Sequence, residues 1–341
     1  MPGIGSDPGS WRVYLGLMQT DRRTGTGKNL RVVAFGGGTG LPVLLRGLRD
    51  EVADLTAVVT VTDDGGSSGR LRQELGVAPP GDVRNCLVAL SGRSRLAEVF
   101  NYRFGAGDLS DHAVGNIIIA ALADMGGGFA EGVEQAGRFL RARGHVYPAA
   151  VESLTLVVDY EDGTTTRGET AATAAGKRIS RVRVEPADTP APEAVIQAIR
   201  ASDTVVLSSG SLFTSTIPAL LGGGVREALR EFGGPVIYVA NAMTQHGETR
   251  GFTVADHVEA IADLAGLMVT DVLVHGEDLP EETLRRYLEE GAAPVAVDRA
   301  RLSALGVRLH EADLVFAGEG GVRHDPDRLA KEVLRVGLLR R

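Results

Sequence analysis

The chain has 341 residues, of which 43% are hydrophobic and 23% charged, so its composition is that of a folded globular protein and not of a disordered one. Its 44 acidic residues outnumber 36 lysines and arginines, and the net charge of −8 disfavours nucleic acid and anionic membranes as partners. No apolar run reaches the roughly 20 residues that span a bilayer, and the single cysteine, Cys86, excludes an internal disulfide. We therefore expect a cytoplasmic protein without a membrane span.

Residues 1–29 are rich in Gly, Ser, Thr and Arg. Their one apolar patch, residues 13–18, is too short for the core of a signal peptide. We expect this segment to be a disordered tail, and Met18 is an alternative start of the native protein. The folded part is expected to begin at residue 30.

From residue 30 onward, β-branched apolar runs alternate with helical patterns. Nearly continuous apolar runs are typical of parallel strands that helices cover on both faces. The predicted strands are 30–35, 55–62, 204–207, 235–240, 271–274 and a closing strand at 314–316; the predicted helices are 41–48, 83–90 (capped by Asp82), 96–103, 115–124, 130–141, 193–200, 218–230, 256–264 and 327–339. This alternation predicts a doubly wound, Rossmann-like α/β fold with a mostly parallel sheet. The very apolar helix 115–124 is expected to be buried in the middle of the fold.

The pattern changes to short strands around the turn Asp162-Gly163. We interpret residues 151–186 as a small β insertion, forming an edge or a flap, within one α/β domain that spans residues 30–325. Residues 326–341 are expected to form a C-terminal helix that packs on this domain.

The first predicted strand ends in Gly36-Gly37-Gly38-Thr39-Gly40, which leads directly into a helix. Glycines permit positive φ and let backbone N–H groups approach an anion at a helix N-terminus. The turn therefore predicts a phosphate site, although any tight turn between strand and helix has a similar composition. The Rossmann fingerprint matches in part, because Leu41 stands at its third glycine while Asp63 occupies the place of its ribose-binding acid. A Walker P-loop is excluded, since no matching Gly-Lys-Ser/Thr sequence is present.

Small polar residues follow four of the predicted strands. Because the carboxyl ends of parallel strands line the ligand crevice of an open α/β sheet, we expect these four segments to surround one ligand. The segments are 36–40, 63–69, 208–215 and 241–245.

Two adjacent carboxylates, Asp63 and Asp64, belong to the second segment. They would repel a diphosphate unless a cation intervenes or one of them faces sugar hydroxyls, so Mg²⁺ bound by Asp63 and Asp64 is one interpretation. The other is that a carboxylate, in particular Asp64, caps the following turn. No other cofactor is indicated.

Several further polar residues lie close to these segments in sequence. Arg70, Arg72 and Arg84 are candidates for phosphate counter-charge and Asn85 for an amide contact, although such arginines often pair with surface acids. His112, beside Gly115-Asn116 at a helix start, is a candidate ligand contact or proton shuttle, or else a structural histidine. No Ser-His-Asp, Cys-His or H-E-x-x-H pattern is present, so nucleophilic catalysis and a zinc site have no support.

These segments, in this order, resemble the gluconeogenesis factor family (YvcK-type), whose fold is shared with 2-phospho-L-lactate transferase (CofD-like). The resemblance covers about residues 30–325 and rests on the blocks 36–41, 60–72, 79–85, 101–104, 115–116, 210–215, 243–245, 247–249 and 256–258. It implies a protein that binds UDP-sugars, notably UDP-N-acetylglucosamine, and supports cell shape and growth on gluconeogenic carbon, and not a well-defined enzyme.

The resemblance also assigns roles to residues. It implies that the phosphates contact Gly37, Gly38, Thr39, Gly40, Gly210, Ser211 and Leu212, and that the nucleoside approaches Asn241, Met243 and Gln245. Ser67, Arg84, Asn85, His112 and Asn116 complete the candidate ligand site, while Asp63 and Asp64 match the region where the transferase relatives bring metal and acceptor together. The chain departs from the family pattern at Ser209 and His246, where proline is usual, and at Asp111, where glycine is usual.

Two alternatives remain open at this point. One is a 2-phospho-L-lactate transferase-like enzyme that uses a guanosine diphosphate donor, Mg²⁺ and a deazaflavin acceptor. The other is a dinucleotide oxidoreductase, which Leu41 disfavours. A homodimer is compatible with all three functions. Each requires Gly38 and Ser211 to lie on the same side of the molecule.

Overall fold

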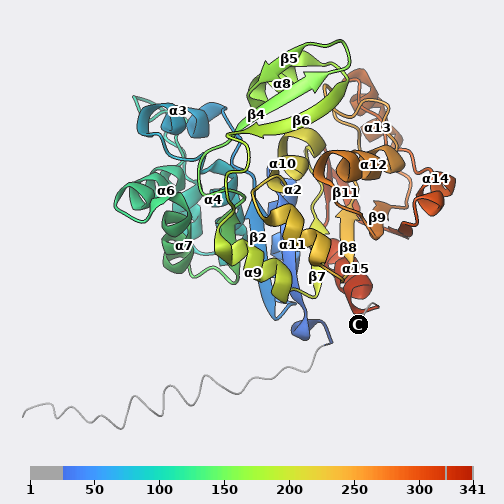
Figure 1. Ribbon diagram of the computed structural model, residues 1–341, viewed down its shortest axis with the longest axis horizontal. Coiled ribbons are helices and arrows are strands. Elements are labelled where there is room, and N and C mark those ends of the chain that lie inside the picture. Colours follow the sequence, from blue (N-terminus) through green and yellow to red (C-terminus); the bar gives the residue numbers. More distant parts are fainter. Residues whose placement is uncertain (1–25, 319–320, 340–341) are drawn as a thin grey trace, which may run out of the picture.

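The computed structural model describes residues 26–318 and 321–339 (Figure 1). Most of the predicted N-terminal tail therefore lies outside the described residues. Its last four residues differ from that prediction, because Thr26–Asn29 forms a 3-10 turn that leads into the first strand.

Seven parallel strands form the central sheet, in the order β10-β9-β8-β7-β1-β2-β3. The chain builds outward from β1 to β3, returns to the other side of β1 as β7, and then builds outward to β10. The direction reverses between β1 and β7, which confirms the doubly wound prediction and makes this the switch point. The strands are β1 Arg31–Gly36, β2 Asp54–Val59, β3 His145–Pro148, β7 Thr204–Leu207, β8 Val236–Val239, β9 Asp271–His275 and β10 Arg308–Ala312.

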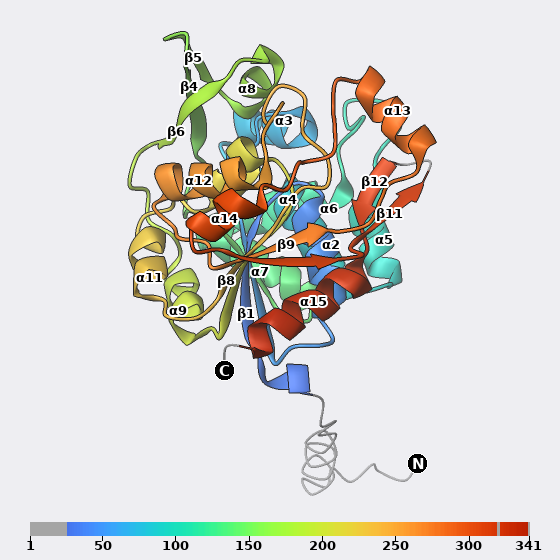
Figure 2. The ribbon, with the colours of Figure 1, turned by 90° about the vertical axis from the view of Figure 1, so that its right-hand side faces the viewer.

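Helices cover both faces of this sheet, which explains why its central strands are largely apolar. Figure 2 shows α2 and α15 on one side of β1 and α9 and α11 on the other. The helices are α2 Gly40–Leu48, α3 Gly66–Leu75, α4 Gly81–Ser91, α5 Arg95–Asn101, α6 Val114–Asp124, α7 Gly128–Leu140, α8 Glu169–Ala175, α9 Glu193–Ala201, the π-helix η2 Leu212–Thr216, α10 Ile217–Ala219, α11 Val225–Glu231, α12 Val254–Ala265, α13 Glu281–Glu289, α14 Arg299–Ala304 and α15 Pro326–Leu338. Residues such as Phe35, Leu44 and Ile237 are fully buried between the layers.

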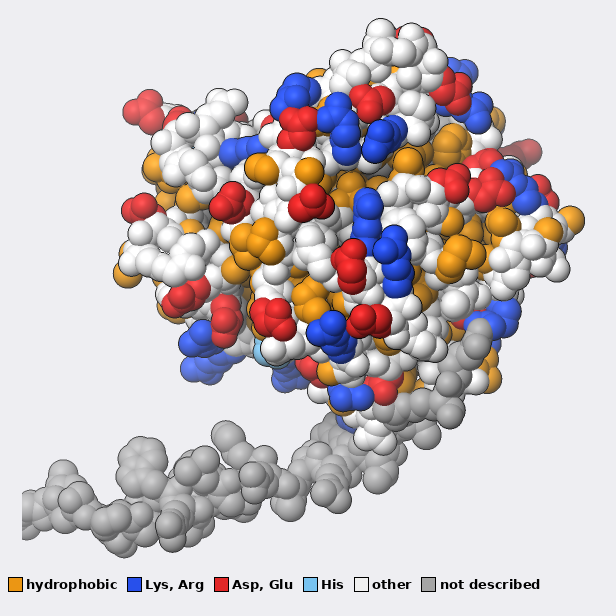
Figure 3. All heavy atoms as spheres, in the orientation of Figure 1, with side chains coloured by type: hydrophobic (Ala, Val, Ile, Leu, Met, Phe, Trp, Pro, Cys, Tyr) orange, Lys and Arg blue, Asp and Glu red, His pale blue; other side chains and the backbone are white. Residues whose placement is uncertain are grey.

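The predicted β insertion is present as an antiparallel sheet of order β5-β4-β6, with α8 between β5 and β6. Its strands are β4 Thr155–Tyr160, β5 Thr165–Arg167 and β6 Ile179–Glu185. It lies beyond the carboxyl ends of the central strands (Figure 1). Basic and acidic side chains are mixed over its surface (Figure 3), and Arg183 and Arg167 both form ion pairs with Glu185.

Four local predictions were wrong. The helix predicted at 218–230 is interrupted, because α10 ends at Ala219 and α11 begins at Val225. The strand predicted at 314–316 does not close the central sheet, because β11 Val315–Gly318 pairs only with β12 Gly321–His324 in a separate hairpin, and β10 closes the sheet instead. Asp82 does not cap α4; Pro80 is the N-cap, and Asp82 lies in the first turn. Helix α6 is only half covered, and Met125 at its end is 81% exposed.

Candidate functional site

The turns after β1 and β7 are in contact at the switch point. A Cβ atom at Gly40 would lie 1.7 Å from the carbonyl oxygen of Ser209, so only glycine allows α2 to begin this close to the second turn. Gly38 has a φ of 57° and no atom within 4 Å of its Cβ position. The first turn therefore combines close backbone packing at Gly40 with open space at Gly38.

The turn after β8 joins the other two through Asn241. Its Oδ1 accepts a hydrogen bond from Gly210 N at 2.8 Å, and its Nδ2 donates to Gly210 O at 2.7 Å and to Gln245 Oε1 at 3.4 Å. Gly210 has a φ of 145°, which favours glycine. Three strand ends therefore meet at one edge of the sheet.

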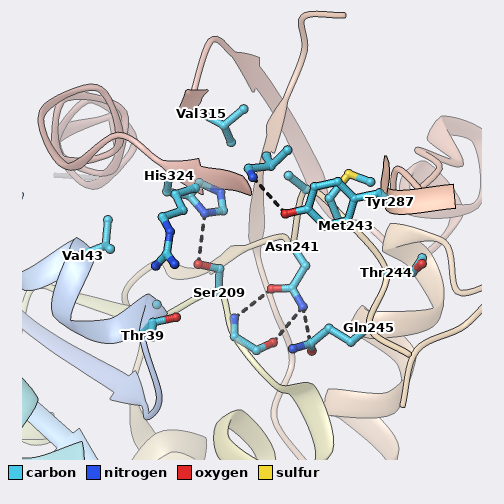
Figure 4. Close-up of a pocket in the computed structure, with 15 residues that line it drawn as sticks. Thr39, Val43, Ser209, Asn241, Met243, Thr244, Gln245, Tyr287, Val315 and His324 are labelled. Atoms are coloured by element: carbon cyan, nitrogen blue, oxygen red, sulfur yellow. Dashed lines mark hydrogen bonds between the residues drawn. The ribbon is translucent and has the colours of Figure 1, made fainter. Parts of the chain in front are cut away.

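A cleft with two lobes lies over these turns, and Figure 4 shows the residues that line the first lobe. The first lobe has a volume of about 240 Å³ and the second about 370 Å³, and both are lined by Thr39, Val43, Arg323 and His324. The first lobe is also lined by Gly40, Ser209, Gly210, Asn241, Ala242, Met243, Thr244, Gln245, Tyr287, Val315 and Val322. The second is also lined by Gly38, Pro42, Arg46, Asn85, Val88, Asn101, Phe316 and Pro326.

The charge of this cleft is positive. Its described lining contains Arg46 and Arg323 and no Asp or Glu. Burial lowers the pKa of Arg46, and so do the nearby charges of Arg49 and Arg323. Within the described part of the chain Arg46 forms no ion pair. In a protein of net charge −8, the described lining of this cleft thus carries basic side chains and no acidic one.

The hairpin β11–β12 forms one wall of the cleft, and its residues were missed at the sequence level. His324 Nδ1 lies 3.2 Å from Ser209 Oγ, while its Nε2 is buried without a hydrogen-bond partner. Burial, with a contribution from His275, lowers the pKa of His324 to about 4, so the ring is neutral at pH 7. Tyr287 Oη accepts a hydrogen bond from Val322 N at 2.9 Å and joins α13 to this wall. No sequence signal marks these residues, because the hairpin reaches the cleft only through tertiary packing.

Acidic side chains lie behind the turns and were not predicted as part of the site. Asp82 Oδ2 accepts a hydrogen bond from Gly38 N at 2.6 Å, and burial, together with Asp63, raises the pKa of Asp82. Burial, and then the charges of Asp63 and Asp82, raise the pKa of Glu169 to about 8. Glu248 accepts hydrogen bonds from Ser211 Oγ at 2.7 and 2.6 Å, and burial raises its pKa as well.

The two predicted metal ligands take part in structural hydrogen bonds. Asp63 Oδ1 accepts from Gly65 N at 2.9 Å, so the turn is capped by Asp63 and not by Asp64. Asp64 Oδ1 accepts from Thr170 N at 3.0 Å and Thr170 Oγ1 at 2.7 Å, at the start of α8. In the ranges that the structure describes, no group of three or more His, Cys, Asp or Glu side chains could hold a metal ion. Magnesium bound by Asp63 and Asp64 together with a ligand's phosphates needs no such group, so it stays a prediction.

A second group of predicted residues packs away from the cleft lining. Ser67 Oγ lies 3.0 Å from His112 Nδ1 and accepts a hydrogen bond from Asn116 Nδ2 at 3.0 Å, which links α3 to the start of α6. His112 is buried, and its pKa is lowered by this burial and by the charge of Arg70. The structure thus gives His112 a structural partner.

The other predicted arginines are also engaged. Arg70 donates to the carbonyl oxygen of Ser110, and Arg72 donates to Thr155 Oγ1 at 2.8 Å in β4. Arg84 is buried and donates to the side chains of Asn85 and Asn101.

The predicted ligand residues thus fall into two sets. Those that line the cleft are Gly38, Thr39, Gly40, Asn85, Gly210, Asn241, Met243 and Gln245. Those outside the lining are Gly37, Asp63, Asp64, Ser67, Arg84, His112, Asn116, Ser211 and Leu212. Gly38 lines the second lobe and its neighbour Gly40 lines the first with Gly210, whereas Ser211, expected beside the ligand with Gly38, lines neither lobe.

The fold and its switch-point cleft define a CofD-like α/β domain: residues 32–315 match the family described as 2-phospho-L-lactate transferase CofD. The chain is 45% identical over 310 residues to the gluconeogenesis factor of Halalkalibacterium halodurans, covering 90% of this chain and 96% of that protein. It is 43% identical over 318 residues to the gluconeogenesis factor of Bacillus subtilis, covering 92% and 99%. The chain belongs to the gluconeogenesis factor family (YvcK-type).

A solved structure agrees with this assignment. The crystal structure of a Bacillus halodurans protein, 45% identical to this chain, superimposes with a TM-score of 0.87 and covers 90% of this chain and 100% of that one.

None of the described helices is both long and apolar enough to cross a membrane.

Two departures from the family pattern have a visible structural setting. Asp111, where the family usually has glycine, adopts a φ of 64°, a left-handed conformation that aspartate tolerates better than most residues. Ser209, the position at which the sequence analysis expected proline, places its hydroxyl 3.2 Å from His324 Nδ1. Ser209 thus forms a polar contact between the β7 turn and the hairpin wall.

Proposed function

We propose that this protein binds a nucleotide sugar of the UDP-N-acetylglucosamine type and acts as a regulatory protein that supports cell shape and growth on gluconeogenic carbon. The observation that carries the proposal is the cleft at the switch point, which is lined by residues of glycine-rich turns and by Arg46 and Arg323, with no acid in its described lining. A diphosphate needs N–H donors and positive charge together.

The arrangement of the lobes supports this ligand class. The phosphates would lie near Thr39, which lines both lobes, and beside Gly40 and Gly210 of the first lobe. The first lobe offers an apolar and aromatic surface from Met243 and Tyr287 for a base. Asn241 and Gln245 lie beside them with polar amide groups, which suits the recognition of a nucleoside.

Thermal unfolding with a ligand panel tests the proposal. A ligand that binds only the folded state stabilises it by about 2.7 kcal/mol at a hundredfold excess over Kd, which a melting curve resolves. UDP-N-acetylglucosamine is expected to raise Tm clearly, and GDP and NAD to raise it less. An unchanged Tm at millimolar UDP-N-acetylglucosamine would contradict the proposal.

A second candidate is a transferase that moves a phospholactyl-type group from a guanosine diphosphate donor to a deazaflavin. The name of the matching family and the carboxyl groups behind the turns, Asp82 and Glu169, favour it. It predicts turnover when the protein receives donor, acceptor and Mg²⁺. Absence of product, together with a Tm shift by UDP-sugars, would eliminate it.

The proposal includes a cytoplasmic location, where nucleotide sugars are made and used, and it is compatible with a homodimer. Fractionation of native cells and light scattering on the purified protein test these two points separately. Recovery of the protein outside the cytoplasm would contradict the first, and a mass of one chain would exclude the second.

A further inference from the structure

The buried Arg84 fixes the orientation of two asparagines at the second lobe. Its Nη1 donates to Asn101 Oδ1 at 2.8 Å and its Nη2 donates to Asn85 Oδ1 at 2.8 Å. A guanidinium has donors and no acceptor, so both amides must turn their oxygens toward Arg84. The orientation of each amide is therefore determined by its partner.

The amide nitrogens of the two asparagines consequently face away from Arg84. Asn85 and Asn101 both line the second lobe, and among the described residues neither Nδ2 has a hydrogen-bond partner. Each Nδ2 carries two N–H donors. The second lobe is therefore lined by two neutral amides with N–H donors, and the buried guanidinium of Arg84 fixes the orientation of both.

The rest of the lobe is suited to a ring with polar edges. Pro42, Val88 and Phe316 supply apolar surface, and the described lining contains no acid that would compete for the donors. The lobe meets the first one at Thr39. A nucleotide sugar has the same order of parts, with a nucleoside and a sugar on opposite sides of a diphosphate.

We infer that the second lobe is the sugar subsite, in which Asn85 and Asn101 donate hydrogen bonds to the oxygen atoms of the sugar and Arg84 is the positioning residue that orients them. This inference rests on the proposed function, because it assigns one half of the proposed ligand to one half of the cleft. It gives the buried Arg84 a role other than direct contact with phosphate.

Titration calorimetry with UDP and with UDP-N-acetylglucosamine tests the inference. The measured quantity is the ratio of the Kd of UDP to the Kd of UDP-N-acetylglucosamine, which is the advantage of the sugar nucleotide. In Asn85→Ala and Asn101→Ala, the advantage of the sugar nucleotide over UDP is expected to fall about fivefold or more, since each loses donors to the sugar. Asn85→Asp keeps an acceptor for Arg84 and removes the donors, so it gives the same result if an alanine variant fails to fold. Its added charge repels UDP more than UDP-N-acetylglucosamine, because UDP carries the larger negative charge, so a fall of the ratio cannot come from that charge.

Two further variants complete the experiment. Arg84→Lys cannot hold both amide oxygens, and it is expected to lower the ratio as the asparagine variants do. Met243→Ala, in the first lobe, is expected to weaken UDP and UDP-N-acetylglucosamine equally and to leave the ratio unchanged.

The outcomes separate the two proposals. If the wild-type protein binds both ligands and Asn85→Asp leaves their ratio unchanged, the sugar subsite is wrong while the proposed function stands. If the wild-type protein binds neither ligand, the proposed function fails, and the subsite assignment fails with it. A fall of the ratio in Met243→Ala alone would place the sugar in the first lobe.

Discussion

Asn241 forms hydrogen bonds to both ends of the Gly210 residue, accepting from its N–H at 2.8 Å and donating to its carbonyl oxygen at 2.7 Å. The turn after β7 is therefore held by the turn after β8, and both face the glycine-rich turn after β1. Because Gly210 lines the first lobe, the position of its peptide groups depends on this one side chain.

The first prediction concerns Asn241→Asp. The carboxylate keeps an acceptor for Gly210 N but loses the donor to Gly210 O, and it adds a negative charge where the phosphates are proposed to bind. We expect UDP-N-acetylglucosamine affinity to fall tenfold or more, and stability to fall by about 1–2 kcal/mol. Calorimetry and urea unfolding measure the two effects.

Gln73→Glu is the matched control for this variant. It adds the same charge on an exposed part of α3 that does not line the cleft. Binding by the control is expected to remain within about twofold of wild type, since exposed charges at a distance are screened by salt. Equal losses in both variants would mean that net charge, and not the contact with Gly210, determines affinity.

The central fold was predictable because its strands are fully covered. After their first residues, Arg31 and Thr204, β1 and β7 carry no polar side chain, and the helices between the strands repeat with regular spacing. The strands that sequence reasoning missed, β3 and β10, lie at the two edges of the sheet and carry polar residues such as His145 and Arg308. Edge strands lack the continuous apolar pattern that identifies buried ones.

Apart from Asn85 in α4, the predicted residues that line the cleft lie at or just after strand ends. Gly38, Thr39, Gly210 and Asn241 follow buried strands, so topology alone brings them together. His324 reaches the cleft from a hairpin that pairs with no strand of the central sheet, and nothing in the local sequence indicates this position.

The second prediction concerns Gly40→Ala. Its Cβ would lie 1.7 Å from the backbone oxygen of Ser209, and backbone atoms at the switch point cannot move aside cheaply. We expect a loss of about 3 kcal/mol or more in unfolding free energy, or failure to fold. Gly105→Ala, with no atom within 4 Å of its Cβ position, is expected to be neutral within about 0.5 kcal/mol. Wild-type stability in Gly40→Ala would show that the two turns are farther apart.

The third prediction concerns Asp64→Ala, which removes the acceptor of Thr170 N and Thr170 Oγ1. Loss of such a contact at a helix start costs about 1 kcal/mol. Amide hydrogen exchange in residues 169–175 is therefore expected to accelerate about fivefold. Asp162→Ala, at the exposed turn of the same insertion, is the control and is expected to leave α8 unchanged. Unchanged exchange in α8 combined with lost ligand binding would make Asp64 a ligand contact instead.

The fourth prediction concerns the pH dependence that Glu169 causes. Its pKa of about 8 in the folded protein lies above the ordinary value of 4.5, so the folded state binds its proton more tightly than the unfolded state. The resulting stability is fully present below about pH 4.5 and is lost as pH rises through 8. Glu169→Gln is therefore expected to be more stable than wild type at pH 9, by on the order of 2 kcal/mol, and similar to it at pH 5. Urea unfolding at both pH values measures this difference in stability. Glu152→Gln, at an exposed position, is the control and is expected to match the wild type at both.

The last prediction concerns His324, whose contribution to stability changes with pH in the direction opposite to that of Glu169. Its pKa of about 4 lies below the ordinary value of 6.5, because burial penalises the charged ring. The folded state thus binds the proton less tightly, and the associated stability is present above pH 6.5 and lost as pH falls toward 4. Between pH 6.5 and 4, the unfolding free energy of the wild type is expected to fall by on the order of 2 kcal/mol more than that of His324→Gln. Urea unfolding measures this difference. The exposed His145→Gln is expected to follow wild type, and a wild-type slope in His324→Gln would show that the ring is already accessible to water.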